Sequence, residues 1–246
     1  MSTSSPKPPW HIAVLIPARN EEVLLPRCLQ SVLQAAALLP QDVTSDVVVV
    51  ADCCIDGTAA LARHLLGARG TVLAAHAGNV GVARALAAQE ALRRFSGDRA
   101  QCWLANTDAD CAVPETWLLD QLQLAWQGYA AVAGIIDVDC FAEHLPTVEE
   151  RFRQTYLIHS DGTHPHVHGA NLGIRADSYL ATGGWSPLPT AEDHDLWNRL
   201  RSSSYPHVSD ARLQVLTSGR RVGRAPLGFA GALAKHNEPV ALEAVS

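Results

Sequence analysis

The sequence has no apolar run close to the roughly 20 residues that a membrane-spanning helix needs, so we expect no transmembrane segment. It also has no excess of positive charge, because 19 basic and 25 acidic residues give a formal net charge of −6 at pH 7. This balance argues against a nucleic-acid partner, whose phosphates attract basic surfaces. No Gly-x-Gly-x-x-Gly motif follows the first predicted strand, which argues against a dinucleotide-binding domain of the usual kind.

Disulfide and secretion signals are missing as well. None of the six cysteines forms a Cys-x-x-Cys pair, and Cys53 and Cys54 are adjacent, a poor geometry for an ordinary bridge. The stretch from Met1 to Pro9 is rich in Ser and Pro and lacks the apolar core of a signal peptide. We therefore expect reduced thiols, a disordered lead-in over residues 1–10 and a cytoplasmic location, with peripheral membrane contact and a dimer left open.

What the sequence does contain is an alternation of apolar runs and amphipathic segments over its first 140 residues. Short, continuously apolar runs are typical of buried parallel strands, and each is followed by a helical pattern such as the stripe within Leu25–Leu38. This rhythm predicts an α/β fold with a mostly parallel central sheet flanked by helices. The predicted strands are His11–Ile16, Asp46–Ala51, Thr71–Ala75, Cys102–Asn106 and Tyr129–Val138.

Asp108 and Asp110 follow the apolar run Cys102–Ala105. On an extended strand, the i, i+2 spacing points both carboxylates to the same side, where two like charges need a cation. Mg²⁺ typically binds one or two carboxylates together with substrate phosphates. The pair therefore predicts a site for a metal and a diphosphate at the carboxyl end of a strand, where open α/β sheets bind ligands. Two solvated turn aspartates are the alternative.

Polar residues also follow the first two predicted strands, with Arg19 and Glu21 after the first and Asp52 after the second. Each of them alone is compatible with a solvated loop. Because successive parallel strands bring their carboxyl ends to one edge, their recurrence predicts a common site at that edge.

The alternation stops after Val138, and the second half of the chain is less regular. A helix is predicted over Thr147–His159, followed by four histidines within His159–His168, whose spacing fits no common zinc signature. A polar loop is favoured there over a zinc site. Further on, Glu192 and Asp193 lie in the first turn of a predicted helix, where acids are stabilised by the helix dipole, so simple capping is the alternative to a chemical role.

Several short stretches, taken in order along the chain, match one family together. They are Ile16–Glu22, Asp52–Thr58, Gly81–Arg84, Asp108–Asp110, Gly169–Arg175, Gly183–Trp185 and Glu192–Asp193. With them the sequence resembles family 2 glycosyltransferases of the GT-A fold, from about His11 to Arg221. The resemblance implies one GT-A domain over 11–222, with a Rossmann-like nucleotide-sugar half (11–140), an acceptor half (141–222) and a tail (223–246).

The resemblance further implies a hexosyltransferase-like enzyme that uses a nucleotide-sugar donor such as a UDP- or GDP-sugar, an unknown acceptor, and Mg²⁺ or Mn²⁺. It assigns nucleotide binding to Pro17, Ala18, Arg19, Glu21, Asp52, Arg84 and Asp108, and the metal to Asp108 and Asp110. It assigns catalysis to Asp193, as the general base that deprotonates the acceptor hydroxyl, with Glu192 beside it, and acceptor binding to His168, Gly169, Asn171 and Trp185. An available base favours inversion of configuration at the transferred sugar.

The sequence departs from the family pattern in two places. Cys53 and Cys54 replace the Gly-Ser that usually follows the first aspartate of the turn after the second strand. The histidine that many relatives carry near the last strand is absent, and Arg220 and Arg221 stand close by, so we expect these arginines to hold the diphosphate, with His168 and His194 as spare metal ligands.

Two other function classes stay open from the sequence. A sugar-phosphate nucleotidyltransferase usually has a Gly-rich phosphate loop with a Lys or Arg after the first strand, and here Arg19 is present without the glycines. A non-catalytic nucleotide- or metal-binding protein is the other, and the presence of Asp108, Asp110 and Asp193 argues against it.

Overall fold

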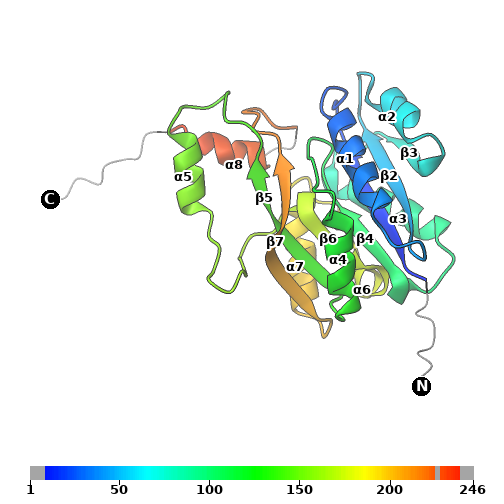
Figure 1. The fold of residues 1–246 in the computed structure, drawn as a ribbon. Coiled ribbons are helices and arrows are strands. Elements are labelled where there is room, and N and C mark those ends of the chain that lie inside the picture. Colours follow the sequence, from blue (N-terminus) through cyan, green and yellow to red (C-terminus); the bar gives the residue numbers. More distant parts are fainter. Residues whose placement is uncertain (1–8, 225–227, 239–246) are drawn as a thin grey trace.

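The computed structural model describes residues 9–224 and 228–238, so the predicted lead-in and tail lie partly outside the described residues. Its strands are β1 (His11–Ala18), β2 (Thr44–Asp52), β3 (Gly70–Ala75), β4 (Cys102–Asn106), β5 (Ala131–Val138), β6 (Leu172–Arg175) and β7 (His207–Thr217). They form one seven-stranded sheet in the order β3-β2-β1-β4-β6-β5-β7 (Figure 1). Only β6 runs antiparallel to its neighbours in this sheet. The predicted mostly parallel sheet is confirmed.

Helices cover both faces of the sheet (Figure 1). On one face lie α1 (Leu25–Ala37), α2 (Thr58–Leu66) and α4 (Trp117–Trp126). On the other lie α3 (Val80–Arg94), α6 (Ala176–Ala181) and α7 (Glu192–Arg201). Short 3₁₀ turns span Gly67–Arg69, Arg99–Gln101 and Gly169–Asn171.

The continuous apolar run of β1 is explained by this two-sided cover. Ile12, Val14 and Ile16 pack into the core on the α1 face, and Ala13 and Leu15 into the core on the α3 face. All five side chains are fully buried. Burying a side chain such as Leu or Ile contributes roughly 1.5–3 kcal/mol, so a strand without polar positions is favoured in the middle of such a sheet.

The two remaining helices form a small unit of their own beside β5 and β7. These helices, α5 (Val148–Thr155) and α8 (Phe229–Lys235), pack through the rings of Phe152 and Phe229, whose centroids are 5.9 Å apart, and through Leu233. In Figure 1 they lie together at the end of the sheet where the parallel strands finish. The segment that follows β7 is thereby brought back to that edge.

Several boundaries differ from those predicted. The helix predicted to reach His159 ends at Thr155, because Tyr156 is extended and packs its ring on His166 at a centroid distance of 3.9 Å. The strand predicted over His11–Ile16 continues to Ala18. The strand predicted from Tyr129 begins only at Ala131. These are local choices that tertiary packing decides.

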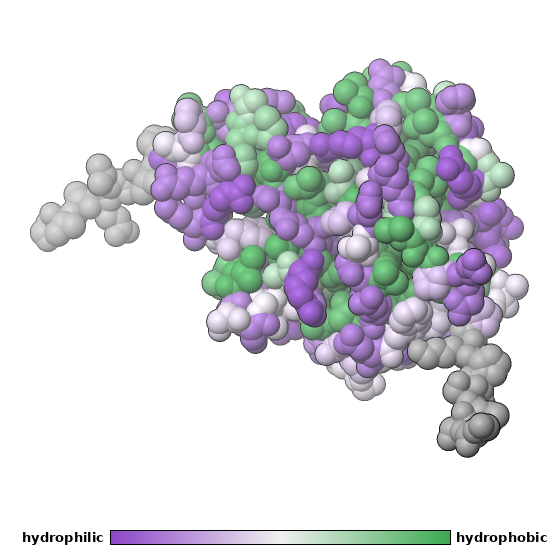
Figure 2. All heavy atoms as spheres, in the orientation of Figure 1, coloured by the Kyte–Doolittle hydropathy of each residue, from purple (hydrophilic) through white to green (hydrophobic). Residues whose placement is uncertain are grey.

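Among the helices in residues 9–224 and 228–238, none combines the length and the apolar character needed to cross a membrane. The face seen in Figure 2 mixes hydrophilic and hydrophobic residues, with an indentation at the upper edge between the part that carries α5 and α8 and the part that carries α1 and α2.

Candidate active site

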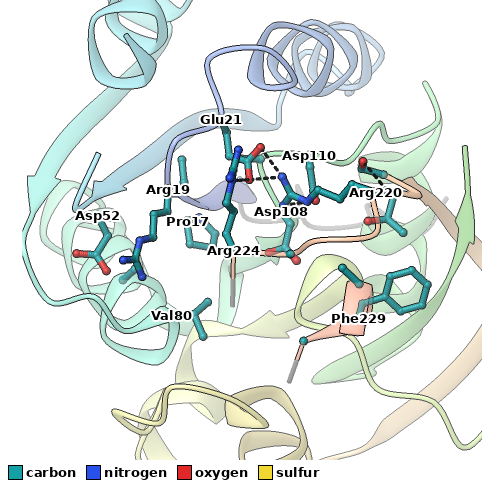
Figure 3. Close-up of a pocket in the computed structure, with 18 of the residues that line it drawn as sticks. Pro17, Arg19, Glu21, Asp52, Val80, Asp108, Asp110, Arg220, Arg224 and Phe229 are labelled. Atoms are coloured by element: carbon teal, nitrogen blue, oxygen red, sulfur yellow. Dashed lines mark hydrogen bonds and ion pairs between the residues drawn. The ribbon is translucent and has the colours of Figure 1, made fainter. Parts of the chain in front are cut away.

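A cavity lies at the carboxyl ends of β1, β2 and β4 and encloses about 920 Å³ of space, its open mouth included. Eight residues of the predicted site line it: Pro17, Ala18, Arg19, Glu21, Asp52, Asp108, Asp110 and Arg220 (Figure 3). The structure therefore brings these strand ends together around one cavity.

The two aspartates do not lie on the strand itself. Strand β4 ends at Asn106, so Asp108 and Asp110 belong to the turn that follows, and the strand geometry assumed for them is wrong. The turn is held in place by Arg27 of α1, which donates to the backbone carbonyl of Asp110 at 2.8 Å, and by a backbone bridge between Ala112 and Leu216. Both carboxylates nevertheless line the cavity.

Asp110 shares a cation with Glu21. The Arg220 guanidinium lies 2.7 Å from Asp110 Oδ2 through Nη2 and 2.7 Å from Glu21 Oε1 through Nη1 (Figure 3). Arg224 lies further from Glu21, at 3.7 Å. Burial raises the pKa of the Glu21 and Asp110 carboxyls above their usual values, and the charge of Arg220 opposes this shift. Arg220 thus neutralises two carboxylates that come from different strand ends.

Asp108 is paired with a different arginine, which does not line the cavity. Arg84 of α3 donates through Nη2 to Asp108 Oδ1 at 2.6 Å and through Nε to Glu192 Oε1 at 3.0 Å. Its side chain is only 3% exposed, and its guanidinium carbon lies 5.3 Å from the ring centroid of Trp185. Arg84, Glu192 and Trp185 therefore form a buried support behind Asp108.

Gly169 leaves the room that this support needs. A Cβ atom at this position would lie 2.4 Å from Arg84 Nη2, closer than real Cβ contacts come. The Gly169 backbone N–H donates to Asp193 Oδ2 at 2.8 Å, and the other Asp193 oxygen accepts from the His194 N–H at 2.8 Å. The Asp193 carboxylate is thereby oriented at the start of α7, beside Glu192, although Asp193 is not among the residues that line the cavity.

Asp52 lines the cavity at the end of β2. Its two carboxylate oxygens accept three backbone N–H groups, from Ala77 at 2.7 Å, Gly78 at 3.1 Å and Asn79 at 3.0 Å. This fixes the loop that leads into α3. Figure 3 shows Arg19 extending into the same part of the cavity as Asp52. The Asp52 carboxylate, already held by three backbone amides, is fixed in position to accept one further hydrogen bond.

The histidine-rich stretch forms a stack of rings. The rings of His164, His166 and His168 stand one behind another, with centroids 5.9 and 6.0 Å apart, and Tyr156 stacks on His166. The Tyr156 hydroxyl lies 2.9 Å from His168 Nε2, and burial lowers the pKa of His168 to about 3. The half-buried His168 imidazole is thus held against the Tyr156 hydroxyl, which is a structural arrangement as well as a candidate contact for the acceptor substrate.

Three further predicted residues lie away from the cavity wall. Asn171 is buried in the core, where it accepts from Trp117 and donates to the carbonyls of Ile135 and Leu213. Trp185 is buried beneath Arg84. Arg221 is exposed, and its backbone N–H donates to Glu143.

Sequence reasoning missed the part of the wall that comes from the segment after β7. Besides Arg220, this segment contributes Gly223, Arg224, Gly228, Phe229 and Ala230. The run that contains Arg220, Arg221 and Arg224 was a usable signal, because basic side chains recur in it close to a predicted anionic ligand. Its last member was assigned to the tail.

The residues fit a divalent cation that shares its coordination with a diphosphate. Asp108 and Asp110 offer hard carboxylate oxygens, and the Asp108 side chain stays 35% exposed in spite of its pairing with Arg84. Within the described ranges, no three His, Cys, Asp or Glu side chains gather closely enough to hold a metal ion alone. A metal held here would need oxygens from its ligand, as Mg²⁺ commonly does in phosphate-binding sites.

Comparison with solved structures places this architecture among GT-A glycosyltransferases. S. aureus TarS 1-349 in complex with UDP-GlcNAc matches with a TM-score of 0.63 at 15% identity, over 89% of this chain and 61% of that one. The mannosyltransferase PcManGT from Pyrobaculum calidifontis, in complex with GDP-Man and Mn²⁺, matches with a TM-score of 0.63 at 18% identity, over 94% of this chain and 71% of that one. The chain thus spans about 61% of the TarS chain, and at such identities the likeness concerns the fold.

None of the curated proteins compared with the chain matches it. A family model described as glycosyl transferase family 2 matches residues 13–181, which is more than half of the chain. The chain therefore belongs to glycosyl transferase family 2, and the family resemblance drawn from the sequence is confirmed.

Proposed function

We propose that this protein transfers a sugar from a nucleotide-sugar donor to an acceptor hydroxyl, with the help of Mg²⁺ or Mn²⁺. The observation that carries the proposal is the meeting of Glu21, Asp108, Asp110 and Arg220 in one cavity at the carboxyl ends of the parallel strands. Carboxylates and a guanidinium in one cleft suit a ligand that brings both a divalent cation and a diphosphate. The family and the matched structures support the same reading.

In this proposal the donor lies along the cavity from the nucleoside to the sugar. Pro17, Ala18, Arg19, Glu21 and Asp52 contact the nucleoside, and Arg220 holds the diphosphate, with Arg221 and Arg224 on the same segment. Asp108 and Asp110 would hold the metal ion, which supplies positive charge where the departing diphosphate becomes more negative. The printed ligands of the matched proteins, UDP-GlcNAc and GDP-Man, make UDP- and GDP-sugars the first donors to test.

Asp193 is the proposed general base, which favours inversion. Its carboxylate is oriented by the backbone N–H groups of Gly169 and His194. It accepts the proton of the acceptor hydroxyl as the new glycosidic bond forms. His168 and Gly169 would shape the acceptor side, whereas Trp185, Glu192 and Arg84 act by positioning Asp108 and the start of α7 rather than by touching substrate.

The base assignment is tested by separating binding from transfer. We expect Asp193→Asn to bind nucleoside diphosphates as the wild type does. The rate at which it releases nucleoside diphosphate from the donor in the presence of acceptor should fall by about 10²–10⁴-fold. The assay follows nucleoside diphosphate released from UDP- and GDP-sugars over a panel of hydroxyl acceptors. Glu115→Gln, at an exposed surface position, is the matched control. Near wild-type turnover in Asp193→Asn would exclude Asp193 as the base.

A further inference from the structure

Arg220 occupies the place between two carboxylates where a cation is needed. Its Nη1 atom lies 2.7 Å from Glu21 Oε1 and 2.9 Å from Glu21 Oε2, and its Nη2 atom lies 2.7 Å from Asp110 Oδ2. The side chains of Glu21 and Asp110 are 6% and 13% exposed, so water screens them poorly. Without a cation between them, these two carboxylates would repel each other in a largely desolvated place.

A metal ion bound to the Asp110 carboxylate would have to share it with Arg220, which is paired with Oδ2. A guanidinium at 2.7 Å from Oδ2 places a positive charge next to the position of any ion bound to that carboxylate. Two cations side by side repel, so a divalent ion that binds alone must displace Arg220. Displacement by the ion alone takes the guanidinium away from Asp110 and leaves it beside Glu21 and the positive Arg224.

A nucleoside diphosphate that binds alone meets the opposite difficulty. Its phosphates attract Arg220, since an arginine fork matches phosphate oxygens. When Arg220 turns to the phosphates, however, Glu21 and Asp110 lose their shared cation while a further negative charge arrives. The charges stay paired only when both ligands bind. The divalent ion then pairs with the Asp110 carboxylate while Arg220 pairs with the phosphates.

The backbone around Arg220 indicates that its side chain, rather than its loop, makes this exchange. The Gly219 N–H donates to Asp139 at 3.0 Å, and the Gly219 carbonyl lies 2.8 Å from His144 Nε2. A Cβ at Gly219 would lie 1.7 Å from the carbonyl oxygen of Cys140, so the chain is closely packed there. Arg220 thus extends from an anchored backbone, and its long side chain is 18% exposed at the cavity wall.

We infer that Arg220 is the counter-cation of Glu21 and Asp110 as long as no ligand is bound. When the donor and the metal ion bind together, the Arg220 guanidinium leaves Asp110 for the diphosphate. This inference rests on the proposed function and adds to it that the two ligands bind cooperatively through Arg220. Linkage requires the effect to be reciprocal: the nucleotide strengthens metal binding by the same factor as the metal strengthens nucleotide binding.

The test is the affinity of the nucleotide-free protein for Mn²⁺, followed by electron paramagnetic resonance of unbound Mn²⁺, in wild type and in Arg220→Gln. We expect Mn²⁺ alone to bind Arg220→Gln about five- to tenfold more tightly than wild type, because its competitor is gone, and the coupling between Mn²⁺ and UDP or GDP to fall by a similar factor. Arg220→Lys, which keeps the charge, should stay close to wild type, as should Arg201→Gln at an exposed position of α7.

The outcomes separate the inference from the proposed function. Equal or weaker Mn²⁺ binding by nucleotide-free Arg220→Gln, in a protein whose circular dichroism matches wild type, overturns the exchange even if Mn²⁺ supports nucleotide binding. If Arg220→Gln does not fold, Arg220→Ala takes its place: a fivefold or greater gain in its Mn²⁺ affinity over wild type supports the exchange, and no gain overturns it. Failure of both proteins to bind UDP or GDP with Mn²⁺ overturns the proposed function instead.

Discussion

The two sides of the paired aspartates are built alike but buried to different depths. On one side Arg84 joins Asp108 to Glu192, and on the other Arg220 joins Asp110 to Glu21. Each arginine thus bridges an aspartate of the turn after β4 and a glutamate from another element. The Arg84 side chain is 3% exposed and lies behind the cavity wall, whereas that of Arg220 is 18% exposed and forms part of the wall.

This difference in burial gives the two arginines different roles: Arg84 supports the site, and Arg220 can exchange one partner for another. Arg84 is enclosed by Trp185 and Gly169 and has no space in which to turn toward a ligand, so its pairs hold the site together. Arg220 faces the cavity and can trade one anionic partner for another. Residue type alone therefore does not assign the role of an arginine in such a site, since the same two kinds of partner are present on both sides.

The largest expected effect comes from breaking the buried side. Arg84→Met leaves Asp108 and the 7%-exposed Glu192 without their cation, and we expect it to lower the free energy of unfolding by roughly 3–5 kcal/mol. Urea unfolding measures this change. Arg220→Met should cost clearly less, because the Arg220 side chain lies at the cavity wall, where it is 18% exposed against 3% for Arg84, and Arg201→Met serves as the surface control. Equal losses for Arg84→Met and Arg220→Met would remove the distinction.

A smaller effect is expected from Gly169→Ala, which crowds the buried Arg84 pairs without removing a charge. Gly169→Ala places a methyl group against the Arg84 guanidinium, and we expect a loss of about 1–3 kcal/mol in the free energy of unfolding, together with slower transfer because the Gly169 N–H orients Asp193. Gly231→Ala is the matched control. Its added methyl meets nothing within 4 Å in helix α8, so stability should stay equal or rise by up to ~1 kcal/mol.

The mildest test uses pH on His168, the half-buried histidine next to Gly169. Because the pKa of His168 is lowered from 6.5 to about 3, the unfolded chain binds one more proton than the folded chain between these values. Stability that is present at pH 7 is therefore lost as the pH falls below 6.5, at up to ~1.4 kcal/mol per pH unit. Asp193, His164, His166 and His194 face the same group and modify the slope.

The measurement is the free energy of unfolding at pH 5, 6 and 7 in wild type and His168→Asn, whose side-chain oxygen can still accept from Tyr156. We expect the free energy of unfolding to depend less steeply on pH in His168→Asn, by an amount that corresponds to the uptake of up to one proton on unfolding. His64→Asn, at an exposed position of α2, should keep the wild-type slope. Identical slopes in wild type and His168→Asn would show that His168 titrates as it does in the unfolded chain.

Much of the fold and half of the site follow from local sequence. Continuous apolar runs predict the parallel strands, and the strand ends then bring Arg19, Glu21, Asp52 and the paired aspartates together, because parallel strands share one carboxyl edge. The positions beyond this edge depend on packing between distant segments. Arg224 and Phe229 reach the cavity only because α8 packs on α5, about 75 residues earlier in the chain, and no local pattern reports such a contact.

Burial of polar residues was the other part that local sequence did not reveal. Asn171 stands in a stretch that resembles an acceptor-binding segment, yet its amide closes hydrogen bonds between β5, β7 and α4 in the core. Arg84 was expected to approach the diphosphate, and the structure places it behind Asp108. In both cases the side chain satisfies buried polar groups, which a sequence pattern cannot distinguish from a ligand contact.

The central claim is that the cavity binds a nucleoside diphosphate together with a divalent metal ion, and calorimetric titration tests it most directly. UDP, GDP and dTDP are titrated into the wild type with and without Mn²⁺, and into Asp110→Ala and the exposed control Asp42→Ala. We predict that one of the nucleotides binds, that its binding requires Mn²⁺, and that Asp110→Ala loses it while Asp42→Ala keeps it. Absence of binding by all three nucleotides in the presence of Mn²⁺, or equal binding by Asp110→Ala, would contradict the account.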